Sequence, residues 1–382
     1  MKIIYLLPHL GKGGAEELVY NLSNNMSNMH DVTLYLLYKT TESKNKLDRL
    51  NAKISVKYLI NYELKFLSKA RLMLLIMNYL TAPIVCLYIF LREKFWTYDI
   101  IHINLTQPSF YMIFFKIMSI IINSKSVYVQ TFHTNYHLLK GVPKYINICS
   151  WYFNDVFIYE LYESDAFNFE RFMPRSKINY FPFGYCDNQT PIKNYSLISE
   201  FTDKDVSLVK IFMTISRVRF SEKKIDIMLR AMYEYKKINR NFLFIIGGDG
   251  EDMIAAKRMS SDLKLDDNVI FLGFVDNVSE LSVLADVYLV SIVGEHSGVS
   301  GMQAISNNIP LVGVQTLEGV KMSDGLMFGD TPKEISVLLL TLDNKERMSE
   351  YLITMSKISA VNCNNEKNFT KLHESLYRSL VE

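Results

Sequence analysis

The stretch from Leu289 to Pro310 contains the residues best suited to binding a charged ligand. The β-branched run Val287–Val293 predicts a buried strand, small turn-prone residues follow over Gly294–Gly301, and a short helix is expected over Met302–Asn307. A strand that enters a helix through such a turn points free backbone N–H groups at one spot, which suits a phosphate. The carboxylate of Glu295 lies at the mouth of the turn and can accept hydrogen bonds from hydroxyl groups. This combination indicates a nucleotide-sugar site; the alternative is a tight turn that binds nothing.

A basic loop over Ser216–Lys224 is the second candidate site. It follows a strand predicted over Val209–Ile215, and ligands of parallel α/β sheets bind at the carboxyl ends of strands. A guanidinium can clamp a phosphate through two hydrogen bonds, and a lysine adds a point charge. This position favours a diphosphate site over the alternative, a solvated basic surface. Four basic residues are candidates: Arg217, Arg219, Lys223 and Lys224.

The first half of the chain has its own candidates. Gly13 and Gly14 follow a strand predicted over Lys2–Leu7 and let a backbone approach a ligand closely. Their loop lacks the G-x-G-x-x-G spacing, so a nicotinamide dinucleotide is not indicated. His133 follows a strand predicted over Ser126–Thr131, again at a carboxyl end. The alternatives are a glycine turn without a ligand and a histidine that is structural or merely exposed.

The elements that position these residues form two α/β halves. Residues 1–187 are expected to form the first Rossmann-like domain, 188–205 a linker and 206–367 the second domain, and a helix over 368–382 is expected to cross back to the first. A cleft between the domains is the expected ligand site. Strands are predicted over 2–7, 32–37, 54–59, 99–103, 126–131, 155–159, 178–181, 209–215, 242–246, 269–272, 287–293 and 311–314.

Composition excludes several classes of protein. The 382 residues are 49% hydrophobic and 21% charged, which is typical of a globular chain and sufficient for two domains. The net charge of +2 gives no bulk electrostatic reason to bind nucleic acid. The four cysteines are far apart in the sequence. We therefore expect neither a zinc site nor a disulfide framework, and we expect a reducing cytoplasm.

The uncharged segment Leu72–Leu91 has about the length of a membrane span. Asn78 and Pro83 interrupt it, and a span would split the first domain. Two helices that meet near Pro83 within the domain are the favoured reading. The flanking Lys65–Lys94 basic residues also suit a helix that lies on an anionic membrane surface, and a true span is the least favoured alternative.

The order of these motifs resembles the retaining glycosyltransferases of family 4, which have the GT-B fold of two doubly wound domains. The resemblance covers most of the chain and is strongest from Ile211 to Val314. It rests on a glycine loop at Gly13–Glu16, on His133, on Arg217 and Lys223, on Ile246–Gly250 and Phe271–Phe274, and on Glu295–Gln303, which resembles an E-x7-E segment.

The resemblance implies transfer of a sugar from a nucleotide-diphosphate sugar with retention, without a metal or a further cofactor. The acceptor would be a glycan or a lipid-linked molecule of bacterial surface polysaccharide (capsule, O-antigen or exopolysaccharide), reached from the cytoplasm at the inner face of the membrane. The implied catalytic residues are His133, Arg217, Lys223 and Glu295. The implied donor-binding residues are Gly13, Gly14, Lys224, Gly248, His296, Ser297, Gly298, Val299, Ser300 and Gln303.

Three departures from the family pattern bear on these roles. Gln303 replaces the second glutamate, the residue that holds the donor ribose in the family. The lost charge is expected to weaken the free energy of donor binding by about 1 kcal/mol. The spacing from Arg217 is one residue longer than usual, which leaves Lys223 and Lys224 as alternatives. Phe183–Cys186 replaces the usual Asn-Gly near the hinge. An epimerase of the same fold and a non-catalytic partner subunit are the rival functions.

Overall fold

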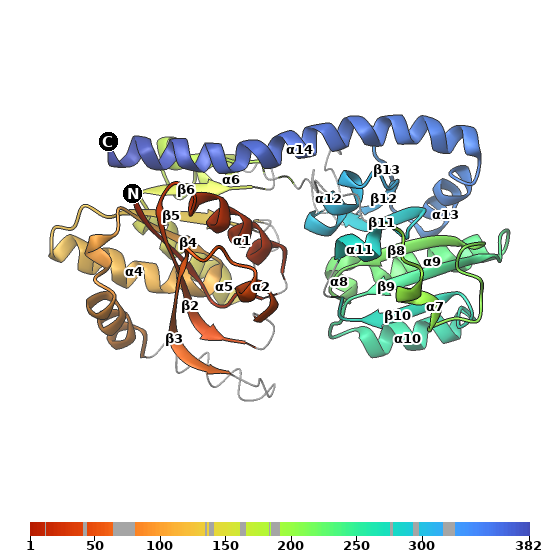
Figure 1. Ribbon diagram of the computed structural model, residues 1–382, viewed down its shortest axis with the longest axis horizontal. Coiled ribbons are helices and arrows are strands. Elements are labelled where there is room, and N and C mark those ends of the chain that lie inside the picture. The colour runs from red at the N-terminus through yellow and green to blue at the C-terminus, as the bar shows by residue number, and fades with distance from the viewer. Residues whose placement is uncertain are drawn as a thin grey trace. The chain divides into compact units, whose positions relative to one another are not determined.

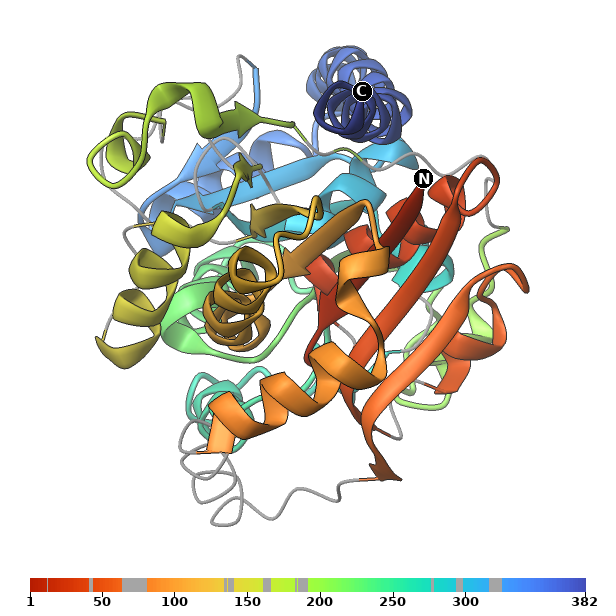
Figure 2. The same ribbon diagram turned by 90° about the vertical axis from the view of Figure 1, so that its left-hand side faces the viewer.

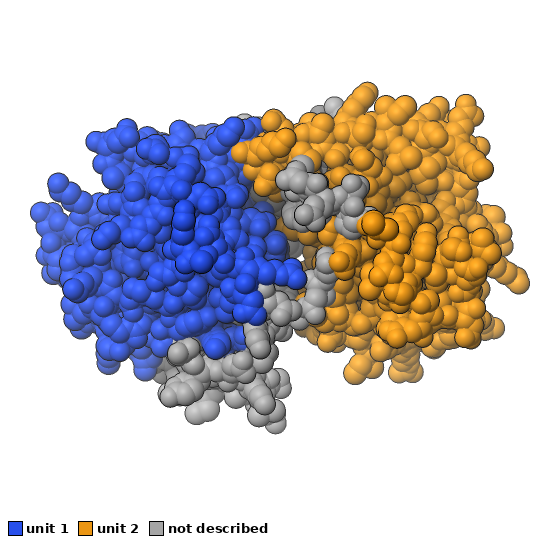
Figure 3. All heavy atoms as spheres, viewed as in Figure 1, with its two compact units in different colours: residues 1–183, 368–382 blue, residues 184–367 orange. Residues whose placement is uncertain are grey.

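The computed structural model describes residues 1–11, 13–40, 44–63, 81–133, 136, 141–160, 166–182, 184, 192–275, 278–292, 298–315 and 325–382. The chain forms two compact units (Figure 3). The first consists of Met1–Phe183 with Asn368–Glu382, and the second of Gly184–Lys367. Each unit has its own parallel sheet with helices around it, which confirms the predicted α/β fold with two doubly wound domains.

The first unit has a seven-stranded parallel sheet in the order β3-β2-β1-β4-β5-β6-β7 (Figure 1). The strand order reverses between β1 and β4. Continuous apolar runs such as Ile3–Leu7 are fully buried, as expected for a parallel sheet covered on both faces. The strands are β1 Lys2–Leu7, β2 Asp31–Lys39, β3 Ser55–Glu63, β4 Ile100–Asn104, β5 Val127–Phe132, β6 Val156–Tyr159 and β7 Ile178–Tyr180.

The helices of the first unit include a helical stretch at residues 81–92. It contains Pro83, near which two helices were expected to meet, and residues 72–80 lie outside the described residues. Within the described part of the chain, no helix is both long and apolar enough to cross a bilayer. The others are α1 Gly14–Met26, α2 Lys44–Asp48, α4 Thr106–Ile121, α5 Gly141–Phe153 and α6 Ala166–Phe169.

The second unit has a six-stranded parallel sheet in the order β10-β9-β8-β11-β12-β13, which reverses between β8 and β11. The short β13 was not predicted, because three residues carry too little pattern to be recognised in a sequence. The strands are β8 Lys210–Ile215, β9 Phe242–Gly247, β10 Val269–Gly273, β11 Val287–Ile292, β12 Leu311–Gln315 and β13 Met327–Gly329.

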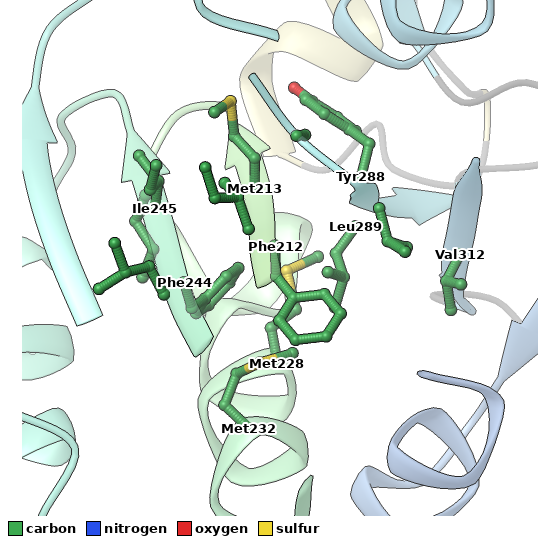
Figure 4. Packing of buried hydrophobic residues seen from close by; sticks show 14 of the residues in the cluster. Phe212, Met213, Met228, Met232, Phe244, Ile245, Tyr288, Leu289 and Val312 are labelled. Atoms are coloured by element: carbon green, nitrogen blue, oxygen red, sulfur yellow. The ribbon is translucent and has the colours of Figure 1, made fainter. Parts of the chain in front are cut away.

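The core of the second unit includes buried residues on both sides of its sheet. Met228 and Met232 of α9 pack beneath the strands, while Tyr288 of β11 lies on the opposite side of the sheet (Figure 4). Ile198, in the expected linker, is also buried in this core. The helices are α7 Ser196–Ser199, α8 Phe220–Lys223, α9 Ile225–Lys236, α10 Met253–Asp262, α11 Val278–Ser282, α12 Gly298–Ser306, α13 Pro332–Thr341 and α14 Lys345–Val381.

The long helix α14 contributes to both units. Met355 is buried in the core of the second unit, whereas His373 and Tyr377 are buried in the first. The helix also contains Cys363, which is disulfide-bonded. The spacing of the cysteines did not predict this bond, because spacing along the chain does not show which thiols meet in space.

Candidate active site

The reversal of strand order between β8 and β11 is where a doubly wound sheet binds its ligands. Among the described residues, the ladder between these strands ends at the pair Tyr288 and Met213. Beyond it, the Tyr288 hydroxyl accepts a hydrogen bond from the backbone N–H of Ile215, with 2.8 Å between nitrogen and oxygen. Burial raises the pKa of Tyr288 to about 12, and a hydrogen bond with the Ser300 side chain opposes this shift. One hydroxyl thus links the end of β8 to the first turn of α12.

The loop after β8 is fixed against the end of β9. The N–H of Ser216 donates to the carbonyl oxygen of Gly247 over 2.9 Å, and the N–H of Val218 donates to that of Asp249 over 3.1 Å. Gly248 has a φ of +118°, and a Cβ there would overlap the carbonyl oxygen of Ser216. This contact explains why position 248 requires glycine, and it holds the backbone around Arg217 in one place.

The structure separates the four basic candidates. Arg219 forms ion pairs with Glu222 and Glu251. Among the described residues, Arg217, Lys223 and Lys224 have no ion pair and no side-chain hydrogen bond. Among the described residues, Arg217 before α8 and Lys223 at its end thus form no ion pair, and Lys224 directly follows the helix.

Lys223 is the lysine that responds to Arg217. Burial lowers the pKa of Lys223, nearby Glu222 opposes this, and the charge of Arg217 lowers it further. The two cations therefore lie close enough to interact through their charges. Lys224 has left-handed backbone geometry, with a φ of +52°, and ends α8. That either lysine binds a diphosphate stays a prediction.

The turn after β11 is only partly described. Glu295, His296 and Ser297 lie outside the described residues. Gly298 has a φ of +68° and opens α12, so the helix begins four residues earlier than expected and includes Val299 and Ser300 in its first turn.

Gln303 lies in the second turn of α12 and is half-buried. In the described part of the chain, its side chain has no hydrogen-bond partner. Its role with a donor ribose stays a prediction.

In the first unit, the loop after β1 lies beside the reversal between β1 and β4. Gly13 is the N-cap of α1, with extended backbone geometry, and Gly14 is the first residue of the helix. A Cβ at Gly13 would overlap the carboxylate of Glu16. Gly13 therefore lets Glu16 fold against the positive end of α1, where a carboxylate is stabilising. Donor binding by Gly13 and Gly14 stays a prediction.

His133 directly follows β5, and both of its ring nitrogens are engaged. Nδ1 lies 2.7 Å from Oε2 of Glu160, and Nε2 lies 2.9 Å from Oδ1 of Asn104. The side chains of His133 and Glu160 are 5% and 2% exposed. The second carboxylate oxygen of Glu160, Oε1, is buried and has no hydrogen-bond partner among the described residues. The three residues form a buried polar cluster at the carboxyl ends of β4, β5 and β6.

Sequence reasoning missed Asn104 and Glu160, although a signal was present. Asn104 ends β4 and Glu160 follows β6, and these strands are the two neighbours of β5. The argument that singled out His133, a polar residue at the carboxyl end of a parallel strand, applies equally to both.

A second histidine, His102 of β4, lies deeper in the first unit. Its Nε2 lies 2.6 Å from Oγ1 of Thr131, and its Nδ1 is hydrogen-bonded to the hydroxyl of Tyr377 in α14. Burial lowers the pKa of His102 well below its usual range, and His373 adds to the effect. His102 is thus a neutral core residue that attaches the end of α14. The described residues contain no group of three histidine, cysteine or acidic side chains arranged to hold a metal.

The chain is similar in sequence to known glycosyltransferases. Residues 209–343 match the family model of glycosyl transferases group 1. The O-antigen biosynthesis glycosyltransferase WclY of Escherichia coli is 22% identical over 322 residues, covering 82% of this chain and 79% of WclY. The alpha-monoglucosyldiacylglycerol synthase of Acholeplasma laidlawii is 26% identical over 201 residues, covering 48% of this chain and 50% of that protein.

Solved structures show the same fold over the whole chain. The structure of Anabaena Alr3699/HepE in complex with UDP and glucose superposes with a TM-score of 0.74 at 16% identity, covering 98% of this chain and 99% of that one. The second unit therefore carries a glycosyl transferases group 1 domain, and the chain is a glycosyltransferase with the GT-B fold.

Proposed function

We propose that the protein transfers a sugar from a nucleotide-diphosphate sugar to a glycan or lipid-linked acceptor, with retention at the anomeric carbon and without a metal. The observation that carries this proposal is the pair of cations Arg217 and Lys223, which form no ion pair among the described residues and interact through their charges. Paired basic side chains can stabilise a leaving diphosphate in the way that a metal ion does in other enzymes.

In the proposed reaction, the bond between the anomeric carbon and the diphosphate oxygen breaks. The acceptor hydroxyl oxygen bonds to the same face of that carbon, and its proton passes to the leaving phosphate. Arg217, Lys223 and the N–H groups of Val299–Gly301 stabilise the negative charge that develops on the diphosphate. Glu295 holds hydroxyl groups of the donor sugar, and His133 orients the sugar.

The relatives suggest which substrates to try first. WclY is named for O-antigen biosynthesis, and the Acholeplasma enzyme is named for a glucosylated diacylglycerol. HepE was solved with UDP and glucose. We therefore propose a uridine diphosphate sugar as the donor, and an acceptor of surface polysaccharide at the inner, cytoplasmic face of the membrane.

The donor site is tested by titrating UDP, GDP and ADP against the full chain in calorimetry. We expect one nucleotide to bind, and Arg217→Ala and Lys223→Ala each to weaken its binding by about 10- to 100-fold, since each removes a charged hydrogen bond. Arg219→Ala is the matched control, because Arg219 is already neutralised by Glu222 and Glu251. Unchanged donor turnover in the Arg217→Ala, Lys223→Ala double variant would overturn the assigned roles.

The two rival functions give different results in the same preparation. A non-catalytic partner subunit is expected to bind none of the nucleotides, a possibility that Gln303 keeps open. An epimerase consumes the nucleotide-sugar without an acceptor and yields a second nucleotide-sugar. Product analysis with and without a lipid-linked acceptor separates both from a transferase.

A further inference from the structure

The helical stretch of residues 81–92 is apolar on both sides. Its inner side, with Cys86 and Ile89, is buried in the core of the first unit. Its outer side carries Ile84 and Leu87, which are 75% and 49% exposed. A helix that is hydrophobic all round normally has apolar surroundings on both sides. In the part of the chain that the structure describes, only the inner side of this helix has apolar surroundings.

Helix α4 packs beside the 81–92 helix and also carries exposed apolar residues at its end. The ring of Phe90 lies 5.6 Å from that of Trp96 and 6.5 Å from that of Phe115 in α4, measured between centroids. The 81–92 helix, orange in the foreground of Figure 2, and α4 thus pack on the same core of the first unit. The exposed apolar side chains of these two helices and of the residues that follow them are what we call the docking face: Ile84, Leu87, Leu91, Trp96, Ile121 and Ile122.

Positive charge borders the docking face. Arg92 ends the helix, Lys94 follows it, and Lys125 follows the exposed end of α4; all three are exposed. The side chain of Glu93 is only 9% exposed and lies 2.7 Å from Lys57 and 2.6 Å from Arg92, so these three side chains together still carry a positive charge.

The sequence around the face is depleted of acidic residues. Residues 100–154 contain no aspartate and no glutamate. Asp99, just before β4, accepts a hydrogen bond from the backbone N–H of Lys2 over 2.7 Å. An exposed apolar centre with a basic border, on a chain whose net charge is only +2, is a local arrangement and not a consequence of overall composition.

We propose that the docking face binds the surface of an anionic lipid bilayer. Its isoleucine and leucine side chains insert between the lipid headgroups and the upper part of the acyl chains. Trp96 lies at the level of the headgroups, and the basic residues at the border contact lipid phosphates. A bilayer offers an apolar layer beneath negative charge, which complements both properties of this surface. The inference deepens the proposed lipid-linked acceptor, but it rests on the surface of the first unit and not on donor chemistry.

The test is flotation of the full chain with vesicles of phosphatidylcholine alone and with about 30 mol% phosphatidylglycerol, at low and high salt. We expect binding to the anionic vesicles that weakens with salt. The double variant Ile84→Glu, Ile121→Glu is expected to lower binding by at least about 10-fold, because two carboxylates then face the phosphates. Both positions are 75% exposed, so the fold tolerates the change.

Ile254→Glu is the matched control, since Ile254 is 85% exposed on α10 of the second unit. It should leave vesicle binding within about twofold of the wild type, because this charge is added away from the face. Nucleotide binding by the double variant is measured in parallel and should be unchanged. The proposal is overturned if the wild type does not float with anionic vesicles, if Ile254→Glu weakens binding equally, or if the double variant only converts an oligomer to monomers. If the wild type binds none of the nucleotides, that result would instead count against the proposed donor.

Discussion

Nδ1 of His133 lies 2.7 Å from a carboxylate oxygen of Glu160, and Nε2 lies 2.9 Å from the amide oxygen of Asn104. The amide nitrogen of Asn104 points to the carbonyl oxygen of His102, 3.5 Å away, which orients the amide oxygen toward His133. Both ring nitrogens thus face a side-chain oxygen of a neighbouring residue. Glu160 therefore fixes the orientation of His133.

The first prediction concerns Glu160 as a positioning residue for His133. Glu160→Ala is expected to lower kcat for donor turnover by about 10- to 100-fold, because the imidazole ring is no longer held in one orientation. The KM for the donor should stay within about threefold of the wild-type value, because the ring remains at the same position in the chain. Glu160→Gln keeps an acceptor for Nδ1–H and should recover part of the loss. Steady-state kinetics check both variants.

The control for this prediction is Glu170→Ala, since Glu170 is half-exposed and forms only a surface ion pair with Arg175 at 3.4 Å. Its kcat should equal that of the wild type. A Glu160→Ala enzyme with wild-type kcat would show that the orientation of His133 does not matter for transfer.

The strands are the part of the fold that the sequence predicts well. Runs such as Phe242–Ile246 are apolar because a parallel sheet buries both of its faces. A continuous apolar run in the sequence therefore predicts such a strand without any knowledge of its neighbours. The choice between Arg217 and Arg219 was not predictable, because it depends on Glu251, which is 32 residues away from Arg219 along the chain. Asn104 and Glu160 depend likewise on which strands become neighbours.

The second prediction concerns Tyr288, whose hydroxyl serves both Ile215 and Ser300. Tyr288→Phe leaves the buried N–H of Ile215 without this partner, so we expect the free energy of unfolding to fall by about 1 to 3 kcal/mol. Nucleotide binding should weaken as well, since the loop after β8 and the start of α12 lose their common contact. Denaturant unfolding and calorimetry measure the two effects.

Tyr233→Phe is the matched control, because Tyr233 is 38% exposed and its hydroxyl has no hydrogen bond among the described residues. It should change neither quantity. Equal stability of both variants would show that the hydroxyl of Tyr288 is not needed at the junction.

The third prediction concerns Gly248. Alanine at this position meets the carbonyl oxygen of Ser216 and a φ of +118°, so Gly248→Ala should cost about 2 to 4 kcal/mol of stability. Gly273→Ala controls for backbone strain alone, because Gly273 has a φ of +68° with no atom within 4 Å of an added Cβ. It should cost only about 1 kcal/mol. Thermal unfolding of the two variants decides whether the close approach to Ser216 matters.

The fourth prediction is a loss of stability in mild acid through His373. Burial lowers the pKa of His373 from 6.5 to about 4, against the opposing hydrogen bond to the carbonyl oxygen of Phe369. The unfolded chain therefore binds a proton near pH 6.5 and the folded chain only near pH 4. The stability due to neutral His373 is complete above pH 6.5 and is lost as the pH falls toward 4, by on the order of 3 kcal/mol in total.

Thermal unfolding at about pH 7.5 and about pH 5 checks this prediction. His373→Leu should flatten the dependence, although His102, with a pKa lowered for the same reason, keeps part of it. Leu372→Ala, at a half-exposed neighbouring position of α14, should retain the full dependence. An unchanged slope in His373→Leu would assign the acid sensitivity to other groups.

The fifth prediction concerns Gln303, whose half-buried side chain has no partner among the described residues. If Gln303 holds the donor ribose through a neutral amide, Gln303→Glu adds a charged acceptor at the same length of side chain. We expect nucleotide affinity to rise by about fivefold, corresponding to about 1 kcal/mol. Gln303→Ala should weaken affinity, since it removes the acceptor altogether. Calorimetry with the preferred nucleotide measures both changes, and equal affinity in the three proteins would place the ribose away from α12.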